Sequence, residues 1–292
     1  MRSSPHTSTP AKPRRLTGLT GLLAGLALLA GGCTTAPPAS SAGATLSSER
    51  IAAIVASPDR SAADRTNDLR RKPAQMLAFI GVRPGMVALD LSAARGYTTE
   101  LIARAVGPTG RVYGQNAPRN PDRVPPAAPE GAASPMAPSM APVMPSAPLN
   151  LAQRASNPAT RNIIPVTRPF EDPIPPEVAV NGLDLVTLMF NYHDFGHMGV
   201  DRARVNRAVF AALKPGGMYV IADHSGRPGT GISESGTLHR IEEAFLRREV
   251  EAAGFKLAQE GYFLRNPADP RDRNTPEPPQ PKDEFVLKFV KP

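Results

Sequence analysis

Residues 87–116, VALDLSAARGYTTELIARAVGPTGRVYGQN, decide the fold of this chain. Val87–Leu91 is a short apolar run, which indicates a buried strand. The small residues of 92–96 follow it and predict a tight turn. From Thr98 apolar residues recur at helical spacing, and Arg111 begins a second strand after a Gly/Pro stop. These elements form a βαβ unit, whose ligand lies beyond the first strand at the helix N-terminus.

The rest of the sequence continues the alternation of strands and helices. Apolar runs and amphipathic segments predict further strands and helices at 163–166, 183–190, 202–213, 218–222 and 237–253. Two last strands, at 255–263 and 285–290, follow each other without an intervening helix. The predicted fold class is therefore α/β, with a mostly parallel sheet, helices on both faces and a final pair of strands.

The composition fits a globular domain and argues against a nucleic-acid partner. Of the 292 residues, 41% are hydrophobic, which is enough for a sizeable core. The net charge is +8, but four basic residues and no acidic ones lie in 1–32, so the remainder has 30 basic and 26 acidic residues. It contains no basic stripe with interleaved aromatic residues, and we expect no nucleic-acid binding.

The N-terminal residues predict export. An arginine pair precedes the apolar segment 16–32, which has the length of a signal-peptide core and is short for a membrane-spanning helix. Residues 28–33, LLAGGC, resemble a bacterial lipobox, in which the cysteine becomes acylated. We therefore predict a lipoprotein-type signal peptide at 1–32 and lipidation at Cys33, the only cysteine of the chain. The alternative is an ordinary cleaved signal peptide with an incidental cysteine.

A lipid anchor at Cys33 would place the protein in the periplasm, attached to the membrane of the bacterial cell envelope. Each buried acyl methylene contributes about 0.8 kcal/mol, so several chains give a firm attachment. The small residues of 33–46 predict a flexible tether, which leaves the domain at 47–292. Within it, 118–149 is rich in Pro, Ala and Met and predicts a disordered insert.

Charged residues of alternating sign occupy 59–72, immediately before the first predicted helix of the βαβ region. Such a run is usually a solvated surface, and this is the primary interpretation. The alternative is that the segment folds over the ligand crevice as a lid, since it directly precedes that helix.

Several phrases of the sequence resemble class I S-adenosylmethionine-dependent methyltransferases. They are VALDLS before the turn, LKPGG before a strand, NYHDF, ADHSG, LHRIEE and the closing DEFVLKFVKP. The last four together resemble a subgroup that includes exported members. The resemblance covers 47–292 without the insert. It implies a Rossmann-like methyltransferase fold, whose seven-stranded sheet ends in an antiparallel hairpin, with S-adenosylmethionine as cofactor and a small-molecule acceptor as partner.

The resemblance also implies where the cofactor is bound. The implied cofactor-binding residues are Asp90, Ser92, Ala94, Gly96, Tyr97, Asn116, Asn191 and Tyr192. The turn keeps a glycine only at Gly96. A non-glycine residue in a left-handed conformation costs about 1–2 kcal/mol, which favours a reshaped turn. Asn116 stands where the family has a ribose-binding acid. Tyr97 and Tyr192 are candidates to face the sulfonium, and the alternative is that they are ordinary aromatic residues at strand ends.

Two histidine–aspartate pairs stand at strand ends. His193 with Asp194, and Asp223 with His224, end two strands that we expect to be neighbours, so their side chains should converge at the crevice. We predict His193, Asp194 and His224 as the catalytic group, with a base role toward the acceptor. No metal is assigned from the sequence. The alternative is a metal site built from His193, His197, Asp223 and His224.

The predicted function is methyl transfer from S-adenosylmethionine to a small acceptor by an exported lipoprotein. Two alternatives stay open, because this cofactor is not expected to be abundant at the cell envelope. One is a metal-dependent cell-envelope enzyme, and the other is a non-catalytic ligand-binding lipoprotein that retains the methyltransferase fold. Fold alone does not choose among them.

Overall fold

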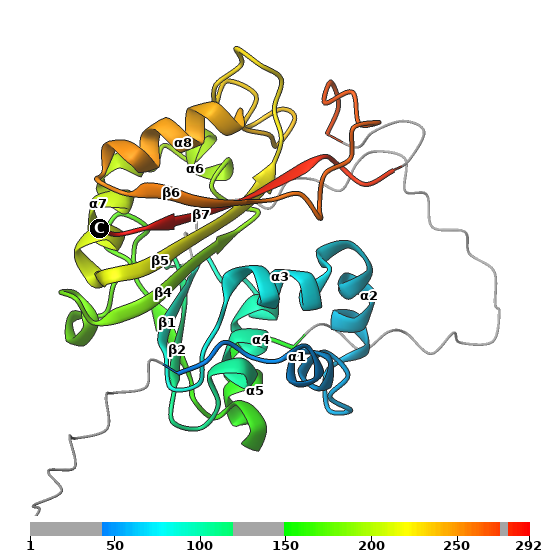
Figure 1. The fold of residues 1–292 in the computed structure, drawn as a ribbon. Helices are drawn as coiled ribbons and strands as arrows, with labels where there is room; N and C mark the ends of the chain where they lie inside the picture. Colours follow the sequence, from blue (N-terminus) through cyan, green and yellow to red (C-terminus); the bar gives the residue numbers. More distant parts are fainter. Residues whose placement is uncertain (1–42, 119–148, 275–279) are drawn as a thin grey trace, which may run out of the picture. The chain divides into compact units, whose positions relative to one another are not determined.

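Seven strands form a single sheet through the described part of the molecule (Figure 1). They are β1 (Val87–Leu91), β2 (Arg111–Asn116), β3 (Ile163–Thr167), β4 (Leu183–Met189), β5 (Leu213–His224), β6 (Lys256–Gly261) and β7 (Glu284–Val290). Their order across the sheet is β3-β2-β1-β4-β5-β7-β6, and β7 runs antiparallel to both of its neighbours. The other pairings are parallel, which confirms the predicted α/β class with a C-terminal antiparallel hairpin.

The computed structural model describes residues 43–118, 149–274 and 280–292, which belong to the compact unit Ala42–Pro292. The predicted signal peptide, Cys33, most of the tether and nearly all of the insert at 118–149 lie outside the described residues. Within the described ranges, no helix has the length and apolar character needed to cross a membrane.

Helices cover both faces of the sheet (Figure 1). One side carries α1 (Ser48–Val55), α2 (Ala62–Arg71), α3 (Pro73–Ile80), α4 (Tyr97–Val106) and α5 (Leu151–Ser156). The other side carries α6 (Asp194–His197), α7 (Arg202–Ala212) and α8 (Glu243–Ala252). The described residues also form two 3-10 turns, η1 (Pro158–Thr160) and η2 (Pro176–Val178). Side chains of β1 alternate between the two cores: Ala88 packs toward the first set of helices, whereas Leu89 and Leu91 pack toward the second.

Local sequence signals explain the helix starts on the first side. Ser47 caps α1, because its Oγ atom accepts a hydrogen bond of 3.2 Å from the backbone N of Arg50. Pro73 stands at the first position of α3, where a missing N–H does no harm. Asn150 and Gln153 form a reciprocal capping box, which starts α5 directly after the insert. This cap fixes where α5 meets the turn after β1.

The prediction of a helix from residue 237 is wrong, because α8 begins only at Glu243. His239 has a left-handed backbone with a φ of 51°, which no helix tolerates. Ile241 instead extends the sheet locally: its N–H donates to His224 O at 3.0 Å, and its carbonyl accepts from Gly226 N at 2.7 Å. The segment before α8 is therefore held against the end of β5, where it carries His239 toward the other histidines.

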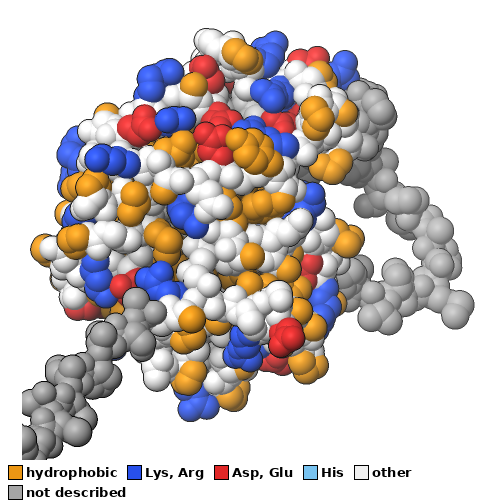
Figure 2. Space-filling model, in the orientation of Figure 1, with side chains coloured by type: hydrophobic (Ala, Val, Ile, Leu, Met, Phe, Trp, Pro, Cys, Tyr) orange, Lys and Arg blue, Asp and Glu red, His pale blue; other side chains and the backbone are white. Residues whose placement is uncertain are grey.

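The surface mixes hydrophobic, basic and acidic side chains on the face shown in Figure 2. The most exposed large hydrophobic residues are Leu69, Val180 and Tyr262, at 82%, 77% and 67% exposure. They come from three separate parts of the chain, and single exposed residues of this kind are normal for a soluble surface. They therefore carry no argument for an interface.

Candidate functional site

The turn after β1 has a left-handed backbone at alternate residues. Ser92, Ala94 and Gly96 have φ angles of 56°, 50° and 82°. Two of these positions carry side chains, at a cost of about 1–2 kcal/mol each. The expectation of a reshaped turn is therefore wrong, because the chain keeps a backbone path that suits glycine. Contacts from outside the turn must hold it.

The end of β2 supplies those contacts. Ser92 N donates to Gln115 Oε1 at 3.0 Å, and Ala93 N donates to Gln115 O at 2.8 Å. Ala94 N donates to Asn116 Oδ1 at 2.8 Å, and Asn116 Nδ2 donates back to Ala94 O at 3.0 Å. A carboxylate has no N–H and would make only half of this contact. Asn116 is therefore placed as a clamp on the turn.

Gly96 is required by the close approach of α5. A Cβ atom at this position would lie 2.6 Å from Leu151 Cδ2 and 3.0 Å from Arg154 Cδ, and the φ of 82° adds strain to any side chain. Arg154 Nε also donates to Arg95 O at 2.7 Å. The guanidinium of Arg154 pairs with Asp64 of α2 at 2.7 Å and with Glu100 of α4. One buried arginine thus ties α2, α4 and α5 to the turn.

Asp90 is buried at the C-terminal end of β1. Its Oδ2 atom accepts from Thr99 Oγ1 at 2.6 Å, and its Oδ1 atom accepts from Thr187 Oγ1 at 2.7 Å. Burial raises the pKa of Asp90, although both hydroxyls oppose that shift. The carboxylate therefore joins β1, α4 and β4 and lies in the wall of the cavity described next.

A cavity of about 230 Å³ opens at the C-terminal ends of β1 and β4. Its walls include the turn residues Ser92 and Ala94, Met189 at the end of β4, and Arg71 of α2. Helix α2 comes from the charged run at 59–72. One of its faces forms part of the cavity wall, as the lid alternative predicted, and it is not simply a solvated surface. The position is the one at which α/β folds bind ligands.

Arg71 is a charged residue of the cavity wall whose guanidinium has an unusual environment. Its guanidinium carbon lies 4.8 Å from the centre of the Phe190 ring and 5.1 Å from that of Tyr97. Its buried Nε atom has no hydrogen-bond partner, and within the described ranges no carboxylate forms an ion pair with it. Burial lowers the pKa of Arg71. A half-buried cation that forms no ion pair with the described carboxylates marks a place where an anion would be stabilised.

The two tyrosines predicted to face the cofactor lie in different places. Tyr97 lines the cavity and donates its hydroxyl hydrogen to Asp68 Oδ1 at 2.6 Å. Tyr192 is fully buried against Phe195, on the side of the sheet that carries α8. Its hydroxyl lies 2.9 Å from Glu249 Oε2 in that helix. Tyr192 therefore does not reach the cavity, which corrects the prediction for this residue.

Asn191 connects the cavity to a second group of polar residues. Ser92 Oγ donates to Asn191 Oδ1 at 2.6 Å, and Asn191 Nδ2 donates to Asp194 Oδ2 at 2.9 Å. The amide thus stands between the turn after β1 and the residues that follow β4. Both ends of the amide contact protein groups, and the predicted role of Asn191 in cofactor binding stays a prediction.

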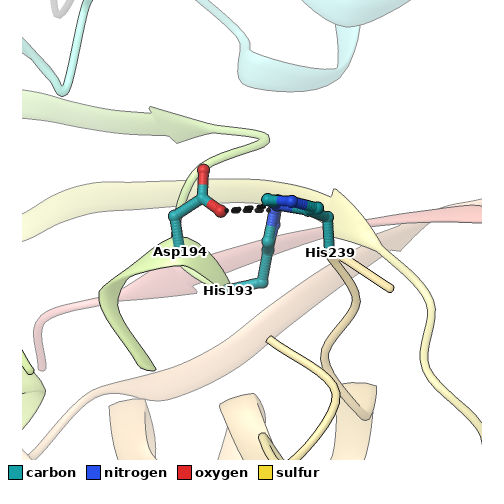
Figure 3. A group of neighbouring side chains, drawn as sticks. All are labelled: His193, Asp194 and His239. Carbon is teal, nitrogen blue, oxygen red and sulfur yellow. Dashed lines mark hydrogen bonds and ion pairs between the residues drawn. The ribbon is translucent and has the colours of Figure 1, made fainter. Parts of the chain in front are cut away.

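The expected convergence of histidines at the ends of β4 and β5 is present. The buried ring of His193 donates from Nδ1 to Asp223 Oδ1 at 2.6 Å, and its backbone N donates to Asp223 Oδ2 at 2.8 Å. Its Nε2 atom lies 3.1 Å from Asp194 Oδ1. His239 reaches the same oxygen from the segment before α8, with Nδ1 at 2.9 Å (Figure 3). The Asp194 carboxylate therefore faces two imidazole rings.

The charges of this cluster do not suit His193 to a base role. Burial opposes protonation, but the carboxylates of Asp223 and Asp194 outweigh it and raise the pKa of His193 to about 9. The pKa of Asp194 is lowered to about 2, because His193 and His239 outweigh its burial. His193 is therefore protonated at neutral pH in the absence of a competing cation, and it acts as a hydrogen-bond donor.

His224 lies beside His193 but faces different groups. The centres of the two rings are 5.3 Å apart, and His224 also stacks on Phe190 at 5.6 Å. Its Nδ1 atom lies 3.0 Å from Glu284 Oε1 without the alignment of a hydrogen bond. Burial lowers the pKa of His224 to about 3, so the ring is neutral and a weak base.

The sequence did not predict three residues that contact the site. Arg71, Gln115 and His239 were not among the predicted site residues, although each contacts a residue that was. Gln115 directly precedes Asn116, and Arg71 lies within three consecutive basic residues at 70–72, which were the available signals. His239 had no local signal, because an unusual backbone conformation brings it to the cluster.

The strand order and the cavity at the end of β1 define the fold of class I S-adenosylmethionine-dependent methyltransferases. A solved structure described as the "complex between the Haloferax volcanii Trm112 methyltransferase activator and the putative methyltransferase" contains a chain similar to this one, with 16% identity and a TM-score of 0.50. The match covers 85% of this chain and 100% of that chain. At such identity the likeness shows the fold alone.

Two further solved structures resemble this chain at lower scores. A SAM dependent methyltransferase from Aquifex aeolicus has 15% identity and a TM-score of 0.48, over 85% of this chain and 100% of that chain. A "possible exported protein" from Bordetella parapertussis has 16% identity and a TM-score of 0.44, over 85% and 80% of the two chains. No protein-family model matches the sequence, and no curated protein matches it significantly.

Proposed function

We propose that the protein is an S-adenosylmethionine-dependent methyltransferase that acts on a small-molecule acceptor. The observation that carries this proposal is Arg71, a cation in the cavity at the ends of β1 and β4 that pairs with no carboxylate of the described residues. The methionine part of the cofactor ends in a carboxylate, which would supply the missing charge through a charge-assisted pair. The fold supports the same conclusion, because the cavity lies where α/β sheets bind ligands.

The chain would contribute mainly by binding and positioning. When bound, the cofactor supplies an activated methyl group for in-line displacement. The clamped turn at 92–96 fixes one wall of the cavity, and Arg71 would orient the carboxylate end of the ligand. Placing two reactants at the right distance accounts for much of the barrier reduction in such reactions. The Ser92–Asn191–Asp194 connection links the cavity to the histidines, which supports an acceptor position on that side.

Calorimetric titration with S-adenosylmethionine and with S-adenosylhomocysteine tests the proposal. Arg71→Met should weaken binding of both ligands at least tenfold, because one charge-assisted contact is worth more than about 1.4 kcal/mol. Arg65→Met is the matched control, since Arg65 lies on the exposed face of the same helix and contacts Ser57 O. Absence of binding of either ligand to the wild-type chain at millimolar concentration would refute the proposal.

We also propose that the protein is exported and anchored to the cell envelope by lipid at Cys33. The support is the apolar segment 16–32 and the LLAGGC phrase at 28–33, which lie outside the described residues. In a bacterial host the wild-type chain should fractionate with membranes, whereas Cys33→Ala should not carry the lipid and should be released. The same fraction for both chains, or an unmodified cysteine by mass spectrometry, contradicts this proposal.

A further inference from the structure

Three side chains from two separate segments meet at one point beside the cofactor cavity. His193 Nε2, Asp194 Oδ1 and His239 Nδ1 lie within 4.8 Å of one another. Figure 3 shows the carboxylate facing the two imidazole rings. Two imidazoles and one carboxylate are a common ligand set for divalent transition metals.

The two separations measured from Asp194 Oδ1 are close to those of a tetrahedral ion. Metal–ligand bonds of about 2.0–2.1 Å place two ligand atoms of a tetrahedral zinc site about 3.3 Å apart. Asp194 Oδ1 lies 3.1 Å from His193 Nε2 and 2.9 Å from His239 Nδ1. Small side-chain shifts would therefore bring all three atoms to bonding distance from a single ion.

The surroundings of His193 favour metal binding over an ordinary polar contact. Asp223 has no exposed surface, and its Oδ1 accepts the Nδ1 hydrogen of His193 at 2.6 Å. This contact orients the ring so that Nε2 points at Asp194. A carboxylate that holds the far nitrogen of a ligand histidine is the usual support of a zinc site. Asn191 similarly holds Asp194 through Oδ2 and leaves Oδ1 for the ion.

We propose that His193, Asp194 and His239 form a binding site for a divalent transition metal. This set differs from the one suggested by the sequence. Both oxygens of Asp223 accept hydrogen bonds from His193, and Oδ1 also accepts from the backbone N of His224. The His224 ring faces Glu284 and Phe190. His197 Nδ1 lies 3.7 Å from Asp194 Oδ1 and contacts Ser235 Oγ, so it stands at the border of the site.

The site is open on one side, which leaves a position for a further ligand. The side chains of Asp194 and His239 are 21% and 40% exposed. A hydroxyl or thiol held at that position would lose its proton to water more readily, because a bound metal lowers its pKa. This role rests on the proposed function: the oxygen or sulfur would form the new bond to the methyl carbon while the carbon–sulfur bond of the cofactor breaks toward sulfur. The site thus fits an acceptor with an ionisable hydroxyl or thiol.

Metal titration of the chelator-treated full chain tests the site without any cofactor. Zn²⁺ should bind with a stoichiometry of one, and Co²⁺ should give the intense visible absorption of a tetrahedral site. His239→Gln and Asp194→Asn should each weaken Zn²⁺ binding at least tenfold. His224→Gln is the control, because its ring lies near His193 but outside the ligand set.

The outcomes separate this inference from the proposed function. Absence of saturable Zn²⁺ binding, or equal Zn²⁺ affinity in wild type and His239→Gln, overturns the metal site. Circular dichroism and melting temperature show whether each variant is folded, and Asp194→Asn gives a second test should His239→Gln fail to fold. Titration of the same samples with S-adenosylmethionine reports on Arg71 and the cavity, so loss of either ligand is recognised separately.

Discussion

For the substitution Asn116→Asp, the family resemblance and the structure predict different results. The change creates the acid that the family uses to bind ribose, so the resemblance implies tighter cofactor binding. The structure predicts damage to the turn instead. In the wild-type chain Asn116 Nδ2 donates to Ala94 O at 3.0 Å. The variant loses this donor and places a carboxylate oxygen opposite the same carbonyl. The other half of the clamp, from Ala94 N, is kept.

The magnitude follows from the lost contact and the group left behind. A hydrogen bond of this kind contributes about 1 kcal/mol net, and water can bind the Ala94 carbonyl that loses its partner, because this residue is exposed. The expected destabilisation is therefore about 1 kcal/mol. In a folded unit of about 250 residues each kcal/mol shifts the melting temperature by about 2–4 °C, so a decrease of about 2–4 °C is expected.

Thermal unfolding at pH 7 measures the change in stability, and a following titration with S-adenosylmethionine measures the change in cofactor affinity. Gln259→Glu is a matched amide-to-carboxylate control, because the Gln259 oxygen accepts from Lys288 Nζ at 3.0 Å and a carboxylate keeps that contact. It should change stability by less than about 0.5 kcal/mol. An unchanged melting temperature for Asn116→Asp, together with tighter cofactor binding, would refute the clamp.

Two further changes test the buried charges. Arg154→Met should destabilise the fold by about 3–5 kcal/mol in urea unfolding, because the buried carboxylate of Asp64 loses its ion pair and that of Glu100 keeps only Arg104. Arg247→Met on an exposed ion pair should cost under about 0.5 kcal/mol. Burial lowers the pKa of His224 to about 3, so the unfolded chain binds the extra proton and stability falls as pH decreases from about 6.5 toward 3. The loss between pH 7 and 5 is up to about 2 kcal/mol, and it should disappear in metal-free His224→Gln; a variant as pH-sensitive as the wild type would exclude this origin.

The fold could be predicted because its signals are local. The apolar run of β1, the small-residue turn and the helical spacing after it act within about 30 residues. Pro165 correctly predicted an edge strand, since β3 ends the sheet and a proline lacks the N–H of a central strand. The convergence of residues at the ends of β4 and β5 followed from the same rule, because parallel neighbours end at one edge.

The incorrect predictions involved partners far away in sequence. Arg154 pairs with Asp64 across 90 residues and buries one face of a run that locally indicates a solvated surface. Tyr192 follows β4 at a position that turns toward α8, where Glu249 and Asn206 bind its hydroxyl. His239 reaches Asp194 only because Ile241 binds along the end of β5. Neither spacing nor composition reports such contacts.

The departures from the glycine-rich pattern form one structural unit. The resemblance implies a glycine-rich turn, whereas this chain has a hydroxyl at Ser92, and its donation to Asn191 Oδ1 makes a connection to Asp194 that glycine lacks the atoms to make. At Ala94 the strained peptide is held by Asn116 through both its N–H and its C=O, which an acid at that position would not do. Serine, alanine and asparagine are therefore matched to one another. Because the same connection runs from the cavity to the histidines, a substitution at Ser92 should affect ligand binding both in the cavity and at the histidine cluster. Ser92→Gly, although it relieves the left-handed backbone, should loosen Asp194 and weaken metal binding, a result that a turn independent of the cluster would not produce.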